Sequence, residues 1–467
     1  MFEKKIYIQR RAELKKSIQS GVVLLLGNGE APSNYSGNDY PFRQDSSFIY
    51  YVGLNAPDLA YVLDIDQDKE YLLGDELTID DIIWMGNLPT LKERAAEVGI
   101  ETVIPSAQLS SLVPVNRKFH YLKPYRYRNL LSLCELLNKK QTEVINDFSV
   151  ELTKAIIRMR LIKSQEELSE LEEAGLIGYA MHMIAMKMCK PGVSEQEIAA
   201  ITEALAMSQG ARASFPTILT MNGQTLHNHN LSGILESGRL MLCDAGAENK
   251  NLYSSDFTRT TAVGGKYSQK QKDIYNIVLK ALNDSIAMAK PGITYQSVHR
   301  NAYKIIFEGL RDLGLTKGNT EEALEAGAPA LFMPHGLGHA MGLDGHDMEN
   351  LGETFVGYDD ETQRDTRFGY QSLRFGKRLE AGHVVTVEPG IYFIPQLIDK
   401  WKAEKINTDF IHFDKLEDYY TFGGIRLEDD IVITPDSCRL VYKKRLPVTT
   451  EEIEQIVENV PQEPRLS

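Results

Sequence analysis

The 467-residue chain has few cysteines, and they are far apart. They are Cys134, Cys189, Cys243 and Cys438, and no Cys-x-x-Cys pair occurs. Zinc knuckles and disulfide frameworks need closely spaced or paired cysteines, so the pattern favours neither. The chain also starts without the apolar segment of a signal peptide. We therefore expect a reduced, cytoplasmic protein.

Long hydrophobic runs and an excess of positive charge are also lacking. The longest early apolar run, Val22–Leu26, is far shorter than the roughly 20 residues that span a bilayer. The chain has 51 Lys and Arg against 65 Asp and Glu, a formal net charge of −14. Phosphate contacts need clustered basic residues. We therefore expect neither a membrane nor a nucleic acid as a partner.

The remaining composition is that of a globular protein, with 43% hydrophobic and 25% charged residues. At roughly 150 residues per domain, the length allows two or three domains. The first 150 residues mix short apolar runs with turn signals, which predicts an α/β domain. We expect strands at Val22–Leu26, Phe48–Val52 and Tyr61–Ile65, and helices near Ile79–Trp84 and Asn129–Lys139.

A domain boundary is predicted near residues 155–163. The apolar positions from Leu152 to Ile162 indicate a long connecting helix, and Ser164-Gln-Glu-Glu167 is a capping box that begins another. We therefore expect an N-terminal domain over 1–155 and a second domain over 164–450. Residues 354–380 read as a long loop, and the tail from Glu463 has little reason to be ordered.

The second domain contains an internal repeat. Lys190-Pro-Gly-Val-Ser194 and Lys290-Pro-Gly-Ile-Thr294 lie 100 residues apart, and each stands between two amphipathic helices. Solenoid repeats have periods of about 20–50 residues, so this interval is too long for a solenoid. It predicts a duplicated α/β unit with its functional site between the two halves.

Acidic residues recur on the strands of this second domain. Asp244 follows the apolar run Arg239–Cys243, Asp256 opens an alternating strand, Glu388 follows His383–Val387, and Glu428 lies on a strand beside Arg426. Each acid alone could be a turn, a helix cap or an edge-strand charge. A buried unpaired carboxylate is costly, so four such acids together indicate a common partner.

A glycine-rich histidine segment lies between the second and third of these strands. His335-Gly-Leu-Gly-His339 has the spacing of helical metal ligands, but its glycines disfavour a helix and no Glu stands between the histidines, so a zincin is not expected. Glycines beside histidines indicate a close backbone approach. Four carboxylates and one imidazole suit two divalent ions that share bridging carboxylates.

These segments resemble the creatinase/methionine-aminopeptidase ("pita-bread") metallopeptidases, in their proline-specific branch of aminopeptidase P and prolidase. The resemblance rests on Asp244-Ala-Gly, Asp256-Phe-Thr-Arg-Thr260, His335-Gly-Leu-Gly-His339, Val387-Glu388-Pro-Gly390 and Gly424-Ile-Arg426-Leu-Glu428. In addition, Phe42–Phe48 and Gly53–Pro57 resemble an aminopeptidase P-type N-terminal domain. The resemblance implies an N-terminal α/β creatinase-like domain, a duplicated pita-bread catalytic domain of α/β (α+β) class, and a homodimer or homotetramer.

The resemblance also implies the site residues. Two divalent metals, most often Mn²⁺ with Co²⁺, Zn²⁺ or Fe²⁺ possible, would be held by Asp244, Asp256, His339, Glu388 and Glu428. Glu388 would also carry the proton, and His227 and His346 would stabilise the tetrahedral oxyanion. His335, Arg426 and Arg374 complete the set as substrate-binding candidates.

The expected activity is exopeptidase cleavage of an Xaa-Pro bond, which releases the N-terminal residue of a peptide. Ser372-Leu-Arg374 resembles a prolidase segment whose arginine holds a dipeptide carboxylate, a contact that suits a guanidinium. Aminopeptidase P is favoured, prolidase is the alternative, and a non-catalytic peptide-binding module is a distant third. One departure is that Asp244 and Asp256 are twelve apart, against eleven expected, which an extra residue in the Lys250–Ser255 turn would absorb.

Overall fold

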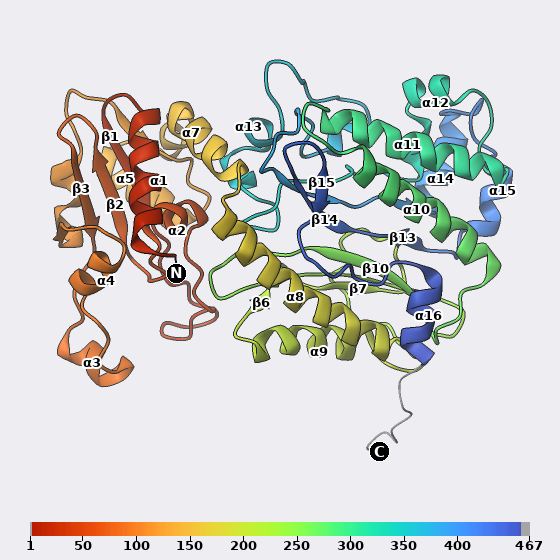
Figure 1. The fold of residues 1–467 in the computed structure, drawn as a ribbon, viewed down its shortest axis with the longest axis horizontal. Helices are drawn as coiled ribbons and strands as arrows, with labels where there is room; N and C mark the ends of the chain where they lie inside the picture. The colour runs from red at the N-terminus through yellow and green to blue at the C-terminus, as the bar shows by residue number, and fades with distance from the viewer. Residues whose placement is uncertain (1, 459–467) are drawn as a thin grey trace. The chain divides into compact units, whose positions relative to one another are not determined.

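The computed structural model of the protein describes residues 2–458 and divides the chain into two compact units (Figure 1). The first unit comprises Met1–Arg160 with Met348–Phe355, and the second comprises Leu161–Asp347 with Val356–Ser467. No helix in the described part of the chain is both long enough and apolar enough to cross a bilayer.

The first unit is built on a five-stranded mixed sheet with the order β4-β3-β2-β1-β5. Its strands are β1 (Val22–Leu26), β2 (Ala60–Asp64), β3 (Lys69–Leu73), β4 (Val103–Ile104) and β5 (Phe119–Tyr121). Neighbours β1, β2 and β3 are antiparallel, whereas β5 and β4 pair in parallel with β1 and β3. Two of the three predicted strands, at Val22 and Tyr61, are thereby confirmed.

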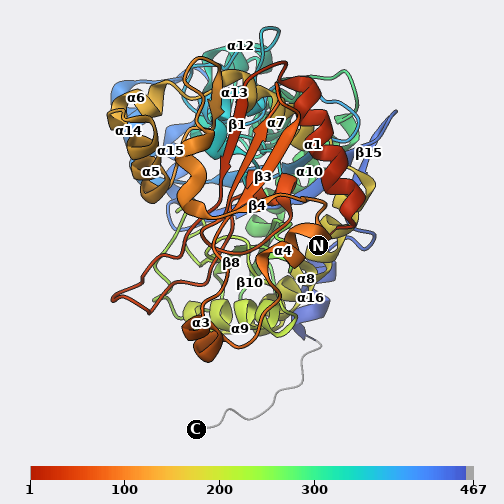
Figure 2. The ribbon, with the colours of Figure 1, turned by 90° about the vertical axis from the view of Figure 1, so that its left-hand side faces the viewer.

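Helices accompany the sheet in this unit. They are α1 (Lys4–Ser17), α2 (Ser46–Val52), α3 (Ile79–Met85), α4 (Leu91–Glu97), α5 (Tyr127–Leu137), α6 (Gln141–Asn146) and α7 (Val150–Leu161). Figure 2 shows the strands with α1 on one side and α5 and α6 on the other. Leu130 and Leu133 of α5 pack on Val22, Leu24 and Val62 of the sheet, so the apolar faces of α5 and the sheet form this core.

The strand predicted at Phe48–Val52 is wrong, because these residues form helix α2. Asp45 accepts a hydrogen bond from the Phe48 amide as the N-cap, and Gly53 ends the helix in the left-handed conformation at φ 76°. Every residue of α2 is buried, so its sequence has no polar face and its apolar run resembles a buried strand.

The strands of the second unit form several small sheets. They are β6 (Arg212–Ala213), β7 (Ile218–Thr220), β8 (Leu240–Ala245), β9 (Ala247–Glu248), β10 (Phe257–Ala262), β11 (Val384–Val387), β12 (Gly390–Tyr392), β13 (Gly424–Arg426), β14 (Asp429–Ile433) and β15 (Cys438–Leu440). Strand β8 lies between β10 and β7, β14 lies between β11 and β15, and β12 pairs with β13. The sheets of the two halves meet where Thr258 bridges Glu428.

Helices of this unit surround the strands. The longer ones are α8 (Gln165–Met188), α9 (Glu195–Ser208), α10 (Gln269–Met288), α11 (Tyr295–Asp312), α14 (Pro395–Glu404) and α16 (Thr450–Glu458), and the shorter ones are α12 (Thr320–Ala326) and α15 (Phe413–Leu416). Helix α13 (Glu353–Gly357) begins in the segment assigned to the first unit and ends in the second. Ser164 caps α8 with the predicted capping box. Helices α8 and α9 lie side by side, as do α10 and α11 (Figure 1).

The internal repeat corresponds to matching local structures. Ser194 and Thr294 are the N-caps of α9 and α11, and each forms an isolated antiparallel bridge, to Ile234 and Arg378 respectively. The glycine two residues earlier has a positive φ in both copies, 83° at Gly192 and 86° at 292. Two chain segments 100 residues apart therefore fold into the same helix–turn–helix, as the repeat predicts.

A buried arginine fixes the junction between the two halves. Arg259 of β10 is fully buried, and its Nη2 atom lies 2.7 Å from Asp429 Oδ1. Its Nη1 atom donates to the Thr258 carbonyl at 2.9 Å and to the Glu428 carbonyl at 2.7 Å. One guanidinium thus holds the backbone at both residues of the bridge.

Replacing Arg259 by Leu should destabilise the protein by roughly 3–5 kcal/mol, because it leaves Asp429 with less compensation and several carbonyls without donors. Urea unfolding followed by circular dichroism measures the loss. Arg300→Leu is the matched control, since its ion pair with Glu321 is exposed and should contribute little. Equal effects of the two substitutions would contradict this account of Arg259.

Candidate metal centre

The acids and histidines predicted from the sequence converge on one cavity of about 780 Å³. All ten predicted site residues line it, namely His227, Asp244, Asp256, His335, His339, His346, Arg374, Glu388, Arg426 and Glu428. They come from both copies of the repeat. The cavity therefore lies between the two halves of the second unit, as expected for a duplicated fold.

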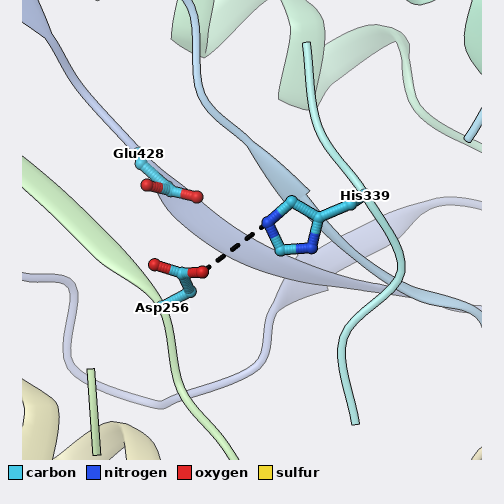
Figure 3. Close-up of side chains that lie close together, drawn as sticks. All are labelled: Asp256, His339 and Glu428. Carbon is cyan, nitrogen blue, oxygen red and sulfur yellow. Dashed lines mark ion pairs between the residues drawn. The ribbon is translucent and has the colours of Figure 1, made fainter. Parts of the chain in front are cut away.

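Three of these side chains form a compact buried group. Asp256, His339 and Glu428 each present one ligand atom, and these atoms lie within 4.8 Å of one another. Figure 3 shows the two carboxylates and the imidazole pointing towards one another. The His339 Nε2 atom is 3.6 Å from Asp256 Oδ2, too far for a hydrogen bond. A metal ion suits this arrangement because it can bind all three groups at once.

Strand pairing places two of the acids on either side of Thr258. Thr258 of β10 is opposite Asp244 of β8 on one side and bridges Glu428 on the other. The Thr258 hydroxyl donates to Glu428 Oε2 at 2.7 Å. The Thr258 and Thr260 side chains share one face of β10, since their hydroxyls both contact the segment 426–428. Sheet register therefore positions these carboxylates.

The strand predicted to carry Arg426 and Glu428 is interrupted. Strand β13 ends at Arg426 and β14 begins at Asp429, so Glu428 lies in the short connection between them. Arg426 and Glu428 nevertheless point the same way, because the Thr258 hydroxyl contacts both the Arg426 Nε at 3.2 Å and the Glu428 carboxylate.

Arg426 contacts Asp244 within the cavity wall. Its Nη2 atom donates to Asp244 Oδ2 at 2.5 Å, and its Nη1 atom donates to the Tyr392 hydroxyl at 3.0 Å. The same hydroxyl is 2.8 Å from His335 Nε2. Arg426, Tyr392 and His335 therefore form one hydrogen-bonded chain that orients the Asp244 carboxylate.

The glycines of the histidine segment permit very close backbone packing. A Cβ atom at Gly336 would lie 2.5 Å from the Leu373 Cα, and one at Gly338 would lie 2.1 Å from the Thr386 carbonyl oxygen. The segment is not helical, as predicted. The His339 amide donates to the Thr386 hydroxyl at 3.2 Å, which holds the backbone of the residue that carries the imidazole.

Glu388 follows strand β11 and faces both histidines. Its Oε1 atom is 3.7 Å from His339 Nε2, and its Oε2 atom is 3.9 Å from His335 Nδ1. The Glu388 amide donates to the Leu337 carbonyl at 2.8 Å. The carboxylate is thus held beside the group of Asp256, His339 and Glu428.

Burial dominates the electrostatics of the site. It raises the pKa of Asp256, with the charge of Glu428 as the next cause, and raises the pKa of Glu428, with the charge of Glu388 next. Burial also raises the pKa of Glu388 to about 7. The pKa of His339 is lowered by burial, so its imidazole is neutral. Clustered acids that resist ionisation and a neutral imidazole favour a bound cation.

Unsatisfied carboxylate oxygens support a cation at this position. Among the described residues, Asp244 Oδ1 and Asp256 Oδ1 are buried without a hydrogen-bond partner. A buried oxygen of this kind is costly unless it binds something. The donor set of carboxylates and one imidazole is the kind that divalent ions such as Mn²⁺ accept, so the residues fit a metal.

Several contributors were not predicted from the sequence. Tyr392 joins His335 to Arg426, and Asp430 accepts a hydrogen bond from the Asp256 amide at 3.1 Å. Phe215 and His229 also line the cavity. Tyr392 and Asp430 stand within or beside the quoted motifs, whereas Phe215 is identified only by the folded structure.

The segment between Asp244 and Asp256 contains a tight turn. Leu252 adopts the left-handed conformation at φ 69°, and the Asn249 side chain accepts hydrogen bonds from the Asn251 and Tyr253 amides. The antiparallel register of β8 and β10 is regular from Ala245 opposite 257 onwards. The turn thus connects two strands that pair regularly.

A cavity lined by carboxylates and imidazoles between the halves of a duplicated α/β unit is typical of a metal-dependent enzyme. Residues 169–435 match the metallopeptidase family M24, and residues 7–120 match the aminopeptidase P N-terminal domain. The chain therefore belongs to the M24 metallopeptidase family. This finding confirms the resemblance and the fold class inferred from the sequence.

Named relatives cover almost the whole chain. A probable Xaa-Pro aminopeptidase of Paracoccidioides brasiliensis is 32% identical over 453 residues, 94% of this chain and 92% of the relative. One from Sordaria macrospora is 33% identical over 454 residues, again 94% of this chain and 92% of the relative.

Solved structures of Escherichia coli aminopeptidase P share the fold. The complex with the inhibitor Pro-Leu has a TM-score of 0.79 at 27% identity and covers 98% of both chains. The zinc-substituted enzyme with product has a TM-score of 0.81 at 27% identity, over 99% of this chain and 100% of that one.

The raised pKa of Glu388 predicts an unusual pH dependence in metal-free protein. Between its ordinary value of 4.5 and about 7, the folded carboxyl holds a proton that the unfolded chain has released. Folding stability should therefore fall as the pH rises through this window. Thermal unfolding of chelator-treated protein from pH 4.5 to 7.5 measures the slope.

Glu388→Gln is the control for this prediction, because it removes the titrating group. The fall with rising pH should be smaller in this variant, and Mn²⁺ should reduce it in the wild type by binding the ionised carboxylates. Identical pH slopes for wild type and variant would contradict the prediction.

Proposed function

We propose that this protein is a metal-dependent Xaa-Pro aminopeptidase that releases the N-terminal residue of peptides with proline at the second position. The observation that carries the proposal is the convergence of Asp244, Asp256, His339, Glu388 and Glu428 on one cavity. Membership of the M24 family and the names of the relatives support the same activity.

Two divalent cations, which the resemblance implies to be Mn²⁺, are proposed to bind Asp244, Asp256, His339, Glu388 and Glu428. Asp256 and Glu428 are proposed as the shared ligands, since both lie in the compact buried group. When bound, such cations acidify water and polarise the scissile carbonyl. The two unsatisfied oxygens of Asp244 and Asp256 support this ligand set.

Glu388 is proposed to accept a proton from the attacking water and deliver it to the leaving proline nitrogen. A general acid–base must lie within reach of the proton that it transfers. Its carboxylate faces the cavity beside His335 and His339. This position suits a group that alternately binds and releases one proton.

His227 and His346 are proposed to donate hydrogen bonds to the substrate carbonyl oxygen as it becomes an oxyanion. Both line the cavity, and burial lowers the pKa of His227, so its imidazole is a neutral donor. His335 is proposed to contact the substrate. Arg426 is proposed to act mainly by orienting Asp244, because its donors already bind Asp244, Tyr392 and Thr258.

The second candidate function is an Xaa-Pro dipeptidase activity, which Arg374 favours. Its side chain and Ser372 both line the cavity, where a guanidinium could bind the C-terminal carboxylate of an Xaa-Pro dipeptide. The homodimer or homotetramer, the cytoplasmic compartment and the domain limits of 1–155 and 164–450 stay predictions.

Asp256→Asn and Glu428→Gln should lose bound metal and hydrolysis of an Xaa-Pro tripeptide together, because each removes a shared ligand. His227→Ala and His346→Ala should keep the metal and lose roughly 10²–10³-fold in kcat. Elemental analysis and steady-state turnover separate the two outcomes. Wild-type turnover by metal-loaded Asp256→Asn would overturn the ligand assignment.

Arg374→Ala decides between longer peptides and dipeptides. For an aminopeptidase, hydrolysis of an Xaa-Pro tripeptide should fall little, because its C-terminus extends beyond the scissile proline. For a dipeptidase, the wild type should prefer Gly-Pro, and the variant should lose that preference by about tenfold or more, since a charged contact is lost. Comparing kcat/KM for the two substrates in both proteins measures this, with Arg378→Ala as an exposed-arginine control.

A further inference from the structure

A buried ion pair lies behind the histidine segment. Lys163 Nζ is 3.0 Å from Asp347 Oδ2, and both side chains are only 1% exposed. Lys163 stands immediately before Ser164, the N-cap of α8, and its amide donates to the Gly382 carbonyl at 2.9 Å. Burying two charges costs free energy, so such a pair contributes little to the net stability of the fold. Its presence therefore points to a role other than stabilisation.

Asp347 closes the loop of residues 340–347. Its amide donates to the Ala340 carbonyl at 2.8 Å, and its Oδ1 atom accepts from the Asp344 amide at 3.4 Å. Within the loop, the Gly342 amide donates to the Asp344 carbonyl at 3.1 Å. The side chain that pairs with Lys163 thus also fixes the loop's conformation.

The loop packs directly onto the ion pair. A Cβ atom at Gly342 would lie 2.4 Å from Asp347 Oδ2 and 2.9 Å from Lys163 Cε. Any side chain at position 342 would therefore displace one partner of the pair. On the other side, the Gly342 carbonyl accepts a hydrogen bond from the Ser254 amide at 2.9 Å, so the loop is held from two directions.

We propose that the Lys163–Asp347 ion pair is a positioning element that fixes His346 against His339 in the cavity. His346 directly precedes Asp347, and its ring centroid is 4.1 Å from that of His339. The inference rests on the proposed function, in which His346 contacts the substrate. Neither Lys163 nor Asp347 lines the cavity, so both act through His346.

The two charges fix His346 because the loop that carries it contains glycines at 342 and 345 and has little intrinsic stiffness. Without the pair, the Asp347 backbone can shift and His346 shifts with it. A displacement of about 1 Å in a catalytic group can cost about 100-fold in rate. Four of the five proposed ligands lie on other elements, and the Thr386 hydroxyl holds the His339 amide from outside the loop, so metal binding should persist.

The test measures kcat, KM and metal content of the full-length holoenzyme with an Xaa-Pro tripeptide. Lys163→Met removes the cation and keeps the chain length of the side chain. We expect kcat to fall by up to about 100-fold, with KM and metal content within about twofold of wild type. Lys272→Met is the matched control, because Lys272 pairs with Glu454 and lies outside the cavity lining.

A double-mutant cycle with His346→Ala tests whether the pair acts through His346. Lys163→Met should cause no further loss of kcat in the His346→Ala background. Multiplicative losses would overturn the inference, as would loss of metal in Lys163→Met. The variant Lys163→Met/Asp347→Asn carries no unpaired buried charge, so we expect it to fold. Full recovery of kcat in this variant would show a purely structural role of the pair and would also overturn the inference.

A crystal structure of Lys163→Met separates this inference from the proposed function. If His346→Ala keeps wild-type turnover, the proposed catalytic role of His346 fails. The crystal structure of Lys163→Met would still show whether the ion pair positions the His346 ring. A His346 ring displaced from His339 supports the inference, and an unmoved ring overturns it. Unchanged kcat in Lys163→Met with a strong loss in His346→Ala would overturn the inference alone.

Discussion

The structure of the second unit depends on one electrostatic constraint, which is the repulsion and lost hydration of several carboxylates that share a buried cavity. Asp244, Asp256, Glu388 and Glu428 share a cavity in which burial raises the pKa of three of them. Like charges that share one cavity repel each other strongly when water is excluded. The cluster can persist only if cations, hydrogen-bond donors or protons compensate the charge, and the surrounding residues provide or admit each of these.

Strand β10 distributes this compensation between the two halves of the repeat. Thr258 lies between Asp244 and Glu428, and Arg259 holds the backbone of both Thr258 and Glu428 from the opposite face. Arg426 donates to Asp244 from the other half. Each half of the fold therefore supplies hydrogen-bond donors to acids of the other half. The site is complete only when the two halves pack together.

Much of the site could be predicted because its residues stand at strand ends and beside glycines. Asp256, His339 and Glu428 were recognisable from motif and order, and the structure brings all three together. Phe48–Val52 shows where local patterns fail. Its apolar run has no polar face, so a buried helix and a buried strand have the same sequence signature, and only the caps at 45 and 53 distinguish them.

The sequence by itself determined the family, the duplication and the set of acids and histidines, because these depend on residue identity and spacing. Only the tertiary structure decided how the set works. Arg426 could be predicted to share a face with Glu428, but its contact with Asp244 joins residues 182 positions apart. The pairing of Lys163 with Asp347 spans 184 positions. Such contacts arise from packing, which local sequence patterns do not encode.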